Sequence, residues 1–318
     1  MSASARPRIG IIGTGAIGGY YGLMLARAGF EVHFLLRSEY AAVARDGLRV
    51  RHAQLGELHL PNVNVNAWRE AAAMPACDWL LVGAKTTSNR ELAPLIAQVA
   101  APGAKVVLLQ NGLGVEDALR PLLPESLHLL GGLCFICAHR EAPGVVVHQA
   151  QGVCNLGYHS GPATAEERQA LLEQGVSWLR EAGIESSVIA DLNQARWQKL
   201  VWNVPYNGLS VLLHSSTRPL MANPDSRALL QALMQEVVDA TLACGYSLPD
   251  NYAQKLLAYT DRMPDYLPSM YHDFAQRREA ELPALYAAPL AAAAAAGVDM
   301  PRVRMLYQAL AFLQAAQQ

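Results

Sequence analysis

Cysteine is scarce in this sequence, and neither sign of charge is in excess. Among 318 residues there are five cysteines, an odd number that does not make a disulfide framework in a chain of this size. The 25 lysines and arginines are interspersed with 27 aspartates and glutamates, giving a formal net charge of -2. Because no basic stripe is present to neutralise phosphates, nucleic acid is not an expected partner.

A long hydrophobic run is also missing near the N-terminus. Residues 1–8 are polar, and glycines interrupt the apolar stretch that follows, which suits neither a signal peptide nor a membrane span. We therefore expect a cytoplasmic protein that does not associate with membranes. Cys134 and Cys137 have redox or zinc-site spacing, but they lie in a strand-like apolar run without a second pair nearby. Buried free thiols are expected there, and no metal.

The first half of the sequence alternates between strand-like and helical segments. Apolar runs of strand length at 8–12, 31–36, 79–83 and 105–109 are separated by helical stretches, which is typical of a parallel sheet with helices on both faces. Short alternating pieces at 48–51 and 57–60 predict a small antiparallel excursion. The segments 144–148 and 152–157 are interpreted as the two arms of a hairpin.

After residue 163 the strand signals fade, apart from residues 188–189, and helical periodicity dominates. The alanine run 291–296 continues this pattern, since alanine is the best helix former. We therefore predict an α/β protein with an N-terminal Rossmann-type doubly wound parallel sheet in residues 1–189. An all-helical C-terminal domain is expected in residues 190–318. In such an arrangement the first domain carries a cofactor, and substrate binds between the domains.

The first strand leads directly into three glycines at the G-x-G-x-x-G spacing. Gly13 permits a tight turn, Gly15 lets the backbone approach a pyrophosphate, and Gly18 lets helix and strand pack closely. The pyrophosphate then binds the N–H groups at the start of the helix. A glycine turn without a ligand is the alternative, but the position between a strand and a helix favours dinucleotide binding. The expected cofactor-binding residues of this loop are Gly13, Thr14, Gly15, Ala16, Ile17 and Gly18.

The second strand ends in Leu36-Arg37-Ser38 and lacks the acid that NAD enzymes use to hold the ribose 2′-hydroxyl. The permanently charged guanidinium of Arg37 can instead bind a 2′-phosphate in a bidentate way. This favours NADPH over NADH. The alternative is a solvated arginine that happens to follow a strand.

Two further loops follow predicted parallel strands, where doubly wound folds bind ligands. Lys85 follows the third strand and can reach the nicotinamide ribose or a substrate carboxylate. Asn111 follows the fourth strand, and its amide can bind either ligand. Taken alone, however, Asn-Gly at 111–112 is also a common turn.

In the helical half, Lys199, Asn203 and Asn207 recur every four residues along an otherwise apolar helix. Such a spacing returns to nearly the same helix face, so one row offers a cation and two amides. An unpaired lysine among apolar side chains would be costly, which indicates a partner or a function. The alternative is a lysine that extends to solvent and asparagines that satisfy loop backbone.

Together these features resemble the ketopantoate reductase (2-dehydropantoate 2-reductase) family over essentially the whole chain. The match rests on the glycine motif, Arg37, Lys85, the Gln-Asn111-Gly loop, the Lys199 row and the segment from Ser269 to Asp273. The resemblance implies NADPH-dependent reduction of ketopantoate to (R)-pantoate on the route to pantothenate. It also implies that Lys199 is the general acid and that Asn111 orders cofactor and substrate. Substrate-binding roles follow for Asn203, Asn207 and Ser269.

The resemblance weakens after Asp273. Glu281 takes the family's acidic position near the substrate hydroxyl, but Pro283 follows it, and Tyr286-Ala287 replaces the usual Asn-Gly. Glu279 is an alternative for the acidic role. A reductase of a different small 2-oxo acid is therefore a second hypothesis, and a non-catalytic NADPH sensor is a third. The helical domain could also form a homodimer through residues 252–286.

Overall fold

The computed structural model describes residues 6–317, apart from the side chain of Val63, so most of the polar N-terminal segment lies outside the described residues. The chain divides into two compact units. The first comprises Met1–Gln110 and Val115–Leu192, and the second comprises Asn111–Gly114 and Asn193–Gln318. The two units thus separate after Leu192. The segment Asn111–Gly114 belongs to the second unit, although the residues on both sides of it belong to the first.

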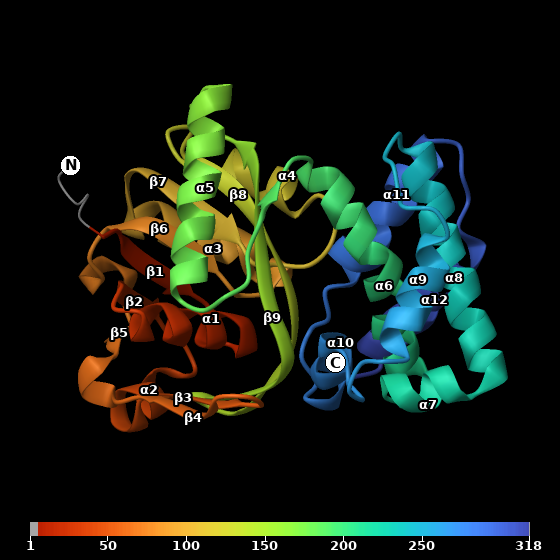
Figure 1. Ribbon diagram of the computed structural model, residues 1–318, viewed down its shortest axis with the longest axis horizontal. Helices are drawn as coiled ribbons and strands as arrows, with labels where there is room; N and C mark the ends of the chain where they lie inside the picture. Colours follow the sequence, from red (N-terminus) through yellow and green to blue (C-terminus); the bar gives the residue numbers. More distant parts are fainter. Residues whose placement is uncertain (1–5, 318) are drawn as a thin grey trace. The chain divides into compact units, whose positions relative to one another are not determined.

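Ten strands among the described residues form one sheet in the first unit, in the order β4-β3-β9-β8-β7-β6-β1-β2-β5, with β10 beside β9 (Figure 1). Pairing is parallel from β8 across to β5, and antiparallel between β8 and β9 and between β3 and β4. The strands are β1 (Arg8–Ile12), β2 (Glu31–Leu35), β3 (Leu48–His52), β4 (Gly56–Leu60), β5 (Asn66–Trp68), β6 (Cys77–Val82), β7 (Ala100–Leu108), β8 (His128–Ala142), β9 (Val145–Ser160) and β10 (Val188–Ile189).

The Rossmann-type parallel sheet and the antiparallel excursion of β3 and β4 are confirmed. The hairpin prediction for 144–148 and 152–157 is wrong, because both segments belong to the single strand β9, whose partner is β8. Gln151 and Gly152 have positive φ values of 64° and 131°, and the pairing with β8 slips there. The supposed turn is therefore an irregularity within one long strand.

Helices cover both faces of the sheet. In the first unit they are α1 (Ala16–Arg27), α2 (Tyr40–Asp46), α3 (Asn89–Val99), α4 (Val115–Leu119) and α5 (Ala165–Glu181), with short 3-10 turns at Asn62–Asn64, Ala71–Ala73, Thr86–Ser88 and Arg120–Leu122. A reciprocal capping box begins α5, where Thr164 Oγ1 accepts from Glu167 N at 3.3 Å and the Glu167 carboxylate accepts from Thr164 N at 2.7 Å.

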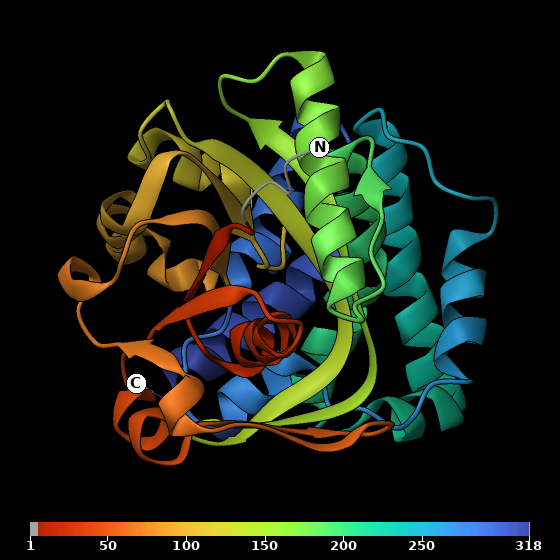
Figure 2. The same cartoon turned by 60° about the vertical axis from the view of Figure 1, so that its left-hand side comes forward.

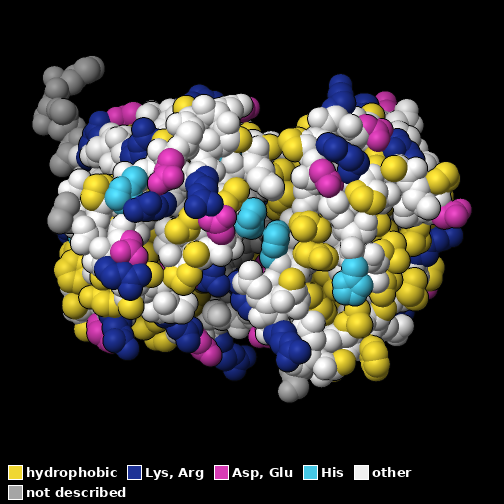
Figure 3. Space-filling model, turned by 90° about the horizontal axis from the view of Figure 1, so that it is seen from below, with side chains coloured by type: hydrophobic (Ala, Val, Ile, Leu, Met, Phe, Trp, Pro, Cys, Tyr) yellow, Lys and Arg dark blue, Asp and Glu magenta, His cyan; other side chains and the backbone are white. Residues whose placement is uncertain are grey.

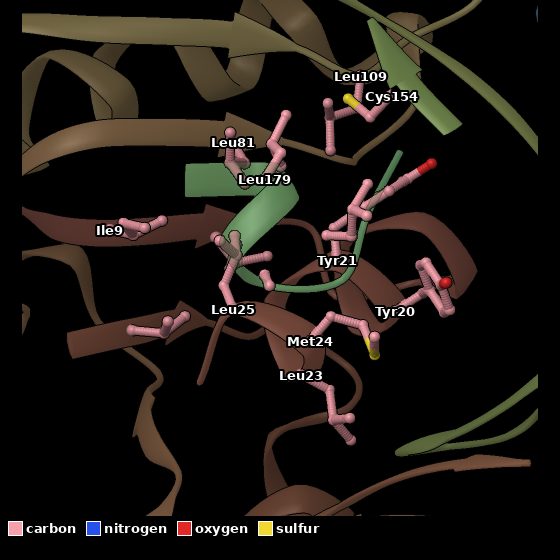
Figure 4. Packing of buried hydrophobic residues seen from close by; sticks show 14 of the residues in the cluster. Ile9, Tyr20, Tyr21, Leu23, Met24, Leu25, Leu81, Leu109, Cys154 and Leu179 are labelled. Atoms are coloured by element: carbon pink, nitrogen blue, oxygen red, sulfur yellow. The ribbon is translucent and has the colours of Figure 1, made fainter. Parts of the chain in front are cut away.

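Helices α1 and α5 lie on the same face of the sheet (Figures 1 and 2). Tyr21 and Leu25 of α1 and Leu179 of α5 gather over alternate strand residues, among them Ile9 and Leu81 (Figure 4). Strand residues with the opposite parity, such as Leu80 and Val106, are also fully buried. Burial on both faces explains why the strands read as continuous apolar runs in the sequence.

The second unit is helical and has its own core, as predicted. Its helices are α6 (Leu192–Leu212), α7 (Thr217–Ala222), α8 (Pro224–Ala243), α9 (Tyr252–Thr260), α10 (Ser269–Ala275), a π-helix at Pro283–Ala287, α11 (Ala288–Ala295) and α12 (Pro301–Ala315). Asn223 caps α8 by accepting from Asp225 N at 2.9 Å and Ser226 N at 3.1 Å. Most of the alanine run lies in α11.

The described surface mixes charges of both signs, as the face drawn in Figure 3 illustrates. In residues 6–317, no helix combines the length and the apolar character needed to cross a membrane. Cys134 and Cys137 are both buried within β8 and are not in disulfides, as expected. Across the same residues, histidines, cysteines and acids form no group of three that could hold a metal ion.

Candidate cofactor and substrate sites

The glycine loop joins β1 to α1, and its geometry requires glycine at two positions. Gly13 has a φ of +86°, and a Cβ there would lie 2.4 Å from the backbone nitrogen of Ala84. A Cβ on Gly18 would lie 2.1 Å from the carbonyl oxygen of Gly13. The first glycine therefore permits the turn and a close approach to the next loop, and the third permits close packing of α1 against that turn.

Gly15 differs from its neighbours, because a Cβ added there would meet nothing within 4 Å. It is the N-cap of α1, no side chain caps that end, and the first turn has no acid. The hydroxyl of Thr14 is buried and finds no hydrogen-bond partner in the described part of the chain. Uncapped helix N–H groups beside open space and an unsatisfied hydroxyl fit a bound pyrophosphate, so the residues present suit a dinucleotide.

The loop after β6 lies directly against the glycine loop. The amides of Gly83 and Ala84 both donate to the carbonyl of Ile12, at 2.9 and 3.2 Å. Strands β6 and β2 flank β1 on opposite sides, which makes the carboxyl end of β1 the switch point where doubly wound sheets bind ligands. Lys85, half-buried, follows Ala84 immediately. The structure thus brings Lys85 and the glycine motif to the same edge of the sheet.

Arg37 lies just beyond β2 and is exposed, with its Nη1 3.3 Å from Glu91 of α3. An acid does follow two residues after Arg37, at Glu39. Its buried carboxylate is bound by Arg140 and accepts from the Gly144 amide at 2.7 Å. Both Glu39 oxygens are thus engaged within the first unit, whereas Arg37 is exposed at the end of β2.

In the second unit, the ammonium of Lys199 on α6 donates to Oδ1 of Asn111 over 2.8 Å. The lysine is half-buried and is followed along the helix by the buried side chains of Leu200 and Val201. An expected polar partner for this lysine is therefore found in the amide oxygen of Asn111, which helps to orient the ammonium.

The rest of the row lies further along α6. Asn207 donates to the carbonyl of Asn203 at 3.0 Å, and its Oδ1 accepts from the amide of Met270 at 3.2 Å. The hydroxyl of Ser269 lies 3.5 Å from the same oxygen. Asn203 and Asn207 are both buried, while Ser269 begins α10 and is exposed. The structure thus brings together three of the side chains that the family resemblance assigns to substrate.

Asn111 is placed by its neighbours in the helical unit. Arg196, a buried arginine of α6, donates to the carbonyl of Gly112 at 3.1 Å. Leu113 donates its amide to the carbonyl of Ala284 at 2.9 Å. Gly112 has a φ of +108°, and a Cβ there would lie 2.4 Å from the Ala284 side chain. Sequence reasoning missed Arg196, because an arginine one turn before Lys199 gives no sign of being buried.

The structure distinguishes the two candidate acids. Glu281 is buried, directly before the helical segment that starts at Leu282, whereas Glu279 is exposed. A carboxylate side chain is favoured at a helix N-terminus. Tyr286 is fully buried and donates to the carbonyl of Val204 at 2.8 Å. The tyrosine that departs from the family pattern is therefore a core residue of the helical unit.

Known proteins resemble the chain across both units. The family model "Ketopantoate reductase PanE/ApbA" matches residues 9–161, and its C-terminal counterpart matches residues 191–314. A 2-dehydropantoate 2-reductase of Nostoc is 41% identical over 303 residues, covering 95% of this chain and 94% of the relative.

Solved structures agree with these matches. A 2-dehydropantoate 2-reductase from Geobacter metallireducens is 38% identical with a TM-score of 0.88, covering 98% of this chain and 100% of that one. The protein of the same name from Methylococcus capsulatus is 31% identical with a TM-score of 0.83, covering 98% of each chain. The chain belongs to the ketopantoate reductase family of oxidoreductases.

Proposed function

We propose that this protein reduces 2-dehydropantoate to (R)-pantoate with NADPH, as a step of pantothenate biosynthesis. The observation that carries the proposal is the position of the Lys199 ammonium, 2.8 Å from the amide oxygen of Asn111. Lys199 lies on α6, the helix that also carries Asn203 and Asn207. Relatives that bear the name 2-dehydropantoate 2-reductase cover nearly the whole chain, which supports the substrate class.

Lys199 acts as the general acid. Reduction of a ketone places negative charge on its oxygen, and a nearby ammonium stabilises that charge and delivers the proton. One of the three N–H groups of Lys199 is directed to Asn111, which helps to fix the position of the ammonium. When bound, the dihydronicotinamide supplies the hydride to the ketone carbon.

The amides of Asn203 and Asn207 and the hydroxyl of Ser269 hold the polar groups of the substrate. Asn207 already uses its side chain to tie α6 to the start of α10, so it also fixes the position of Ser269. Glu281 accepts a hydrogen bond from the substrate hydroxyl, and its burial before a helix makes it the better candidate than the exposed Glu279.

The cofactor proposal rests on the first unit. The open approach to Gly15 and the uncapped start of α1 suit the pyrophosphate. Arg37 suits a 2′-phosphate, and Glu39 is too well engaged to accept from a 2′-hydroxyl. Gly13, Thr14, Ala16, Ile17, Gly18 and Lys85 complete the cofactor-binding set.

The test is NADPH oxidation by the purified protein with 2-dehydropantoate. Lys199→Ala should lower kcat by about 10²- to 10⁴-fold, the usual contribution of a general acid, while NADPH still binds. Lys255→Ala is the matched control, because Lys255 is an exposed lysine of α9 in the same unit. Wild-type activity in Lys199→Ala would remove Lys199 from the mechanism. NADPH binding without oxidation by any 2-oxo acid would favour a sensor.

A different small 2-oxo acid is the second candidate substrate. It is favoured by the segment Pro283–Ala287, which forms a π-helix and directs Tyr286 into the core. The same assay with a panel of branched 2-oxo acids decides between the two, since the true substrate should show the highest kcat/KM.

We also propose that the chain forms a homodimer through its helical unit. Tyr259 in the predicted segment 252–286 is 42% exposed, and Phe312 of α12 is 73% exposed. Large exposed apolar side chains of this kind mark association sites when they lie together. Light scattering on the purified protein measures the oligomeric state, and a monomer would contradict the proposal.

A further inference from the structure

A reciprocal pair of amide side chains lies behind the loop that carries Lys85. Asn89, at the start of α3, donates to Oε1 of Gln110 at 3.0 Å, and Gln110 donates back to Oδ1 of Asn89 at 2.6 Å. Gln110 follows β7 and is 4% exposed, while Asn89 is 8% exposed. The pair therefore links the end of β7 to the start of α3 inside the first unit.

The same Gln110 nitrogen also donates to the backbone carbonyl of Ala84 at 2.8 Å. The amide of Ala84 is held as well, since it donates to the carbonyl of Ile12 at 3.2 Å. Both backbone polar groups of Ala84 are thus fixed, one by β1 and one by the amide pair. Gly13 packs so close to Ala84 that a Cβ on Gly13 would clash with it. Lys85 follows Ala84 directly in the sequence.

Both side-chain N–H groups of Gln110 are used, one toward Asn89 and one toward Ala84. Replacing either member of the pair leaves a buried amide or carbonyl without its hydrogen-bond partner, and this lowers the stability of the folded protein because water cannot take the partner's place. The loop would then relax by moving Ala84, and such a movement changes the spacing between the glycine turn and Lys85. Small displacements of positioning groups can lower binding and rates by about 10²-fold.

We propose that Gln110 and Asn89 are positioning residues for the dinucleotide: they hold Ala84 so that the glycine turn and Lys85 keep a fixed separation. This inference rests on the proposed cofactor function of that edge. Neither side chain needs to contact the cofactor. Their effect passes through the backbone of residues 83–85, whose other anchor is the carbonyl of Ile12.

The experiment compares Asn89→Leu with the exchange variant Asn89→Gln/Gln110→Asn. Asn89→Leu removes the pair, so KM for NADPH should rise about tenfold or more, with a smaller change in kcat at saturating NADPH. In the exchange variant the two amides still reach each other, but the amide at position 110 is one carbon shorter and no longer reaches Ala84. Its melting temperature should therefore recover toward wild type, while KM for NADPH stays raised.

Asn155→Ala is the control for a purely structural loss. Asn155 Oδ1 accepts from the amide and the hydroxyl of Ser187, each at 2.9 Å, so its removal costs stability away from residues 83–85. This variant should melt earlier and keep the wild-type KM for NADPH.

Each outcome decides a different claim. If KM for NADPH simply follows the melting temperature across all variants, or stays at the wild-type value in Asn89→Leu, the positioning role is overturned while the proposed function stands. If the wild-type protein does not bind NADPH at all, the proposed function and this inference are overturned together. Should Asn89→Leu fail to fold, the exchange variant alone decides, because its stability and its KM are expected to separate.

Discussion

Lys199 and Asn111 are 88 positions apart in the sequence, and their side chains meet at 2.8 Å within the helical unit. The contact exists because the Asn111–Gly114 segment leaves the sheet after β7 and packs against α6 and the π-helix, held by Arg196 and Ala284. An amide oxygen restrains the ammonium without removing its charge. The pair is therefore expected to act as one unit, and this can be tested.

A double-mutant cycle on Lys199 and Asn111 should show strong non-additivity. Asn111→Ala removes this restraint on the ammonium and should lower kcat/KM about 10²-fold, while Lys199→Ala should lower it about 10²- to 10⁴-fold. Since residues in direct contact share their effect, the double variant should lose far less than the product of the two single losses. Steady-state kinetics of the four proteins measures this coupling, and strictly multiplicative losses would contradict it.

Arg37 should discriminate between the two nicotinamide dinucleotides. Arg37→Ala is expected to raise the dissociation constant for NADPH far more than that for NADH, because only NADPH carries the 2′-phosphate. Glu91→Gln should strengthen NADPH binding by no more than about fivefold, since the exposed Glu91 competes for Arg37 and such pairs contribute roughly 0–1 kcal/mol. Fluorescence titration with both cofactors measures this, and equal losses in Arg37→Ala would count against the assignment.

Most of the sheet could be predicted from the sequence, because local signals and tertiary burial agree there. The strand before Gly13 is apolar on both faces and ends at a glycine turn, so β1 is found at residues 8–12 as predicted. The hairpin error has the opposite cause. The break between the two segments is not a turn, because the positive φ of Gly152 lets β9 pass the ring of Tyr20, where a Cβ would lie 2.6 Å from the phenol oxygen. Only the neighbouring helix reveals that reason.

The candidate site was predicted in part. Lys199, Asn203 and Asn207 share a helix face by simple periodicity, and the structure adds the hydrogen bonds that join them to Asn111 and α10. The roles of Gln110 and Asn89 could not be predicted, because an amide pair between residues 21 positions apart leaves no local pattern. Likewise, no periodicity indicates that the acid at Glu39 is already engaged by Arg140.

Acid should destabilise the first unit through two stacked histidines. The rings of His52 and His148 are 4.0 Å apart, and Tyr20 of α1 stacks on His148 at 4.8 Å. Burial lowers the pKa of both histidines, and repulsion from His148 and Arg27 lowers that of His52 further. His148 Nε2 lies 2.7 Å from the Gln151 carbonyl, while its Nδ1 is buried and has no hydrogen-bond partner in the described part of the chain.

Because these pKa values are depressed in the folded protein, the unfolded chain binds protons first as the pH falls. The stability they contribute is complete above the unfolded pKa of about 6.5 and is lost progressively below it. The melting temperature should therefore fall between about pH 7.5 and about pH 5.5, and less in His148→Phe, which keeps a stacked ring without a titrating nitrogen. Thermal denaturation at both pH values is the measurement, and an equal fall in both proteins would refute this explanation.

Alanine substitutions at Gly15 and Gly18 should fail in different ways, although both lie in the same motif. A Cβ at Gly18 would be 2.1 Å from the Gly13 carbonyl oxygen, so Gly18→Ala must displace α1 or the turn and should lower the melting temperature by several degrees. Gly15 has a φ of -77° and open space around its would-be Cβ, so Gly15→Ala should fold with wild-type stability.

The space that makes Gly15→Ala harmless to the fold is the space we assign to the pyrophosphate. The added methyl group should therefore raise the dissociation constant for NADPH about tenfold or more, because it keeps the phosphates from the backbone N–H groups at the start of α1. Melting curves and NADPH titration of the two variants separate folding from binding. Wild-type NADPH affinity in a stable Gly15→Ala protein would show that the phosphates bind elsewhere.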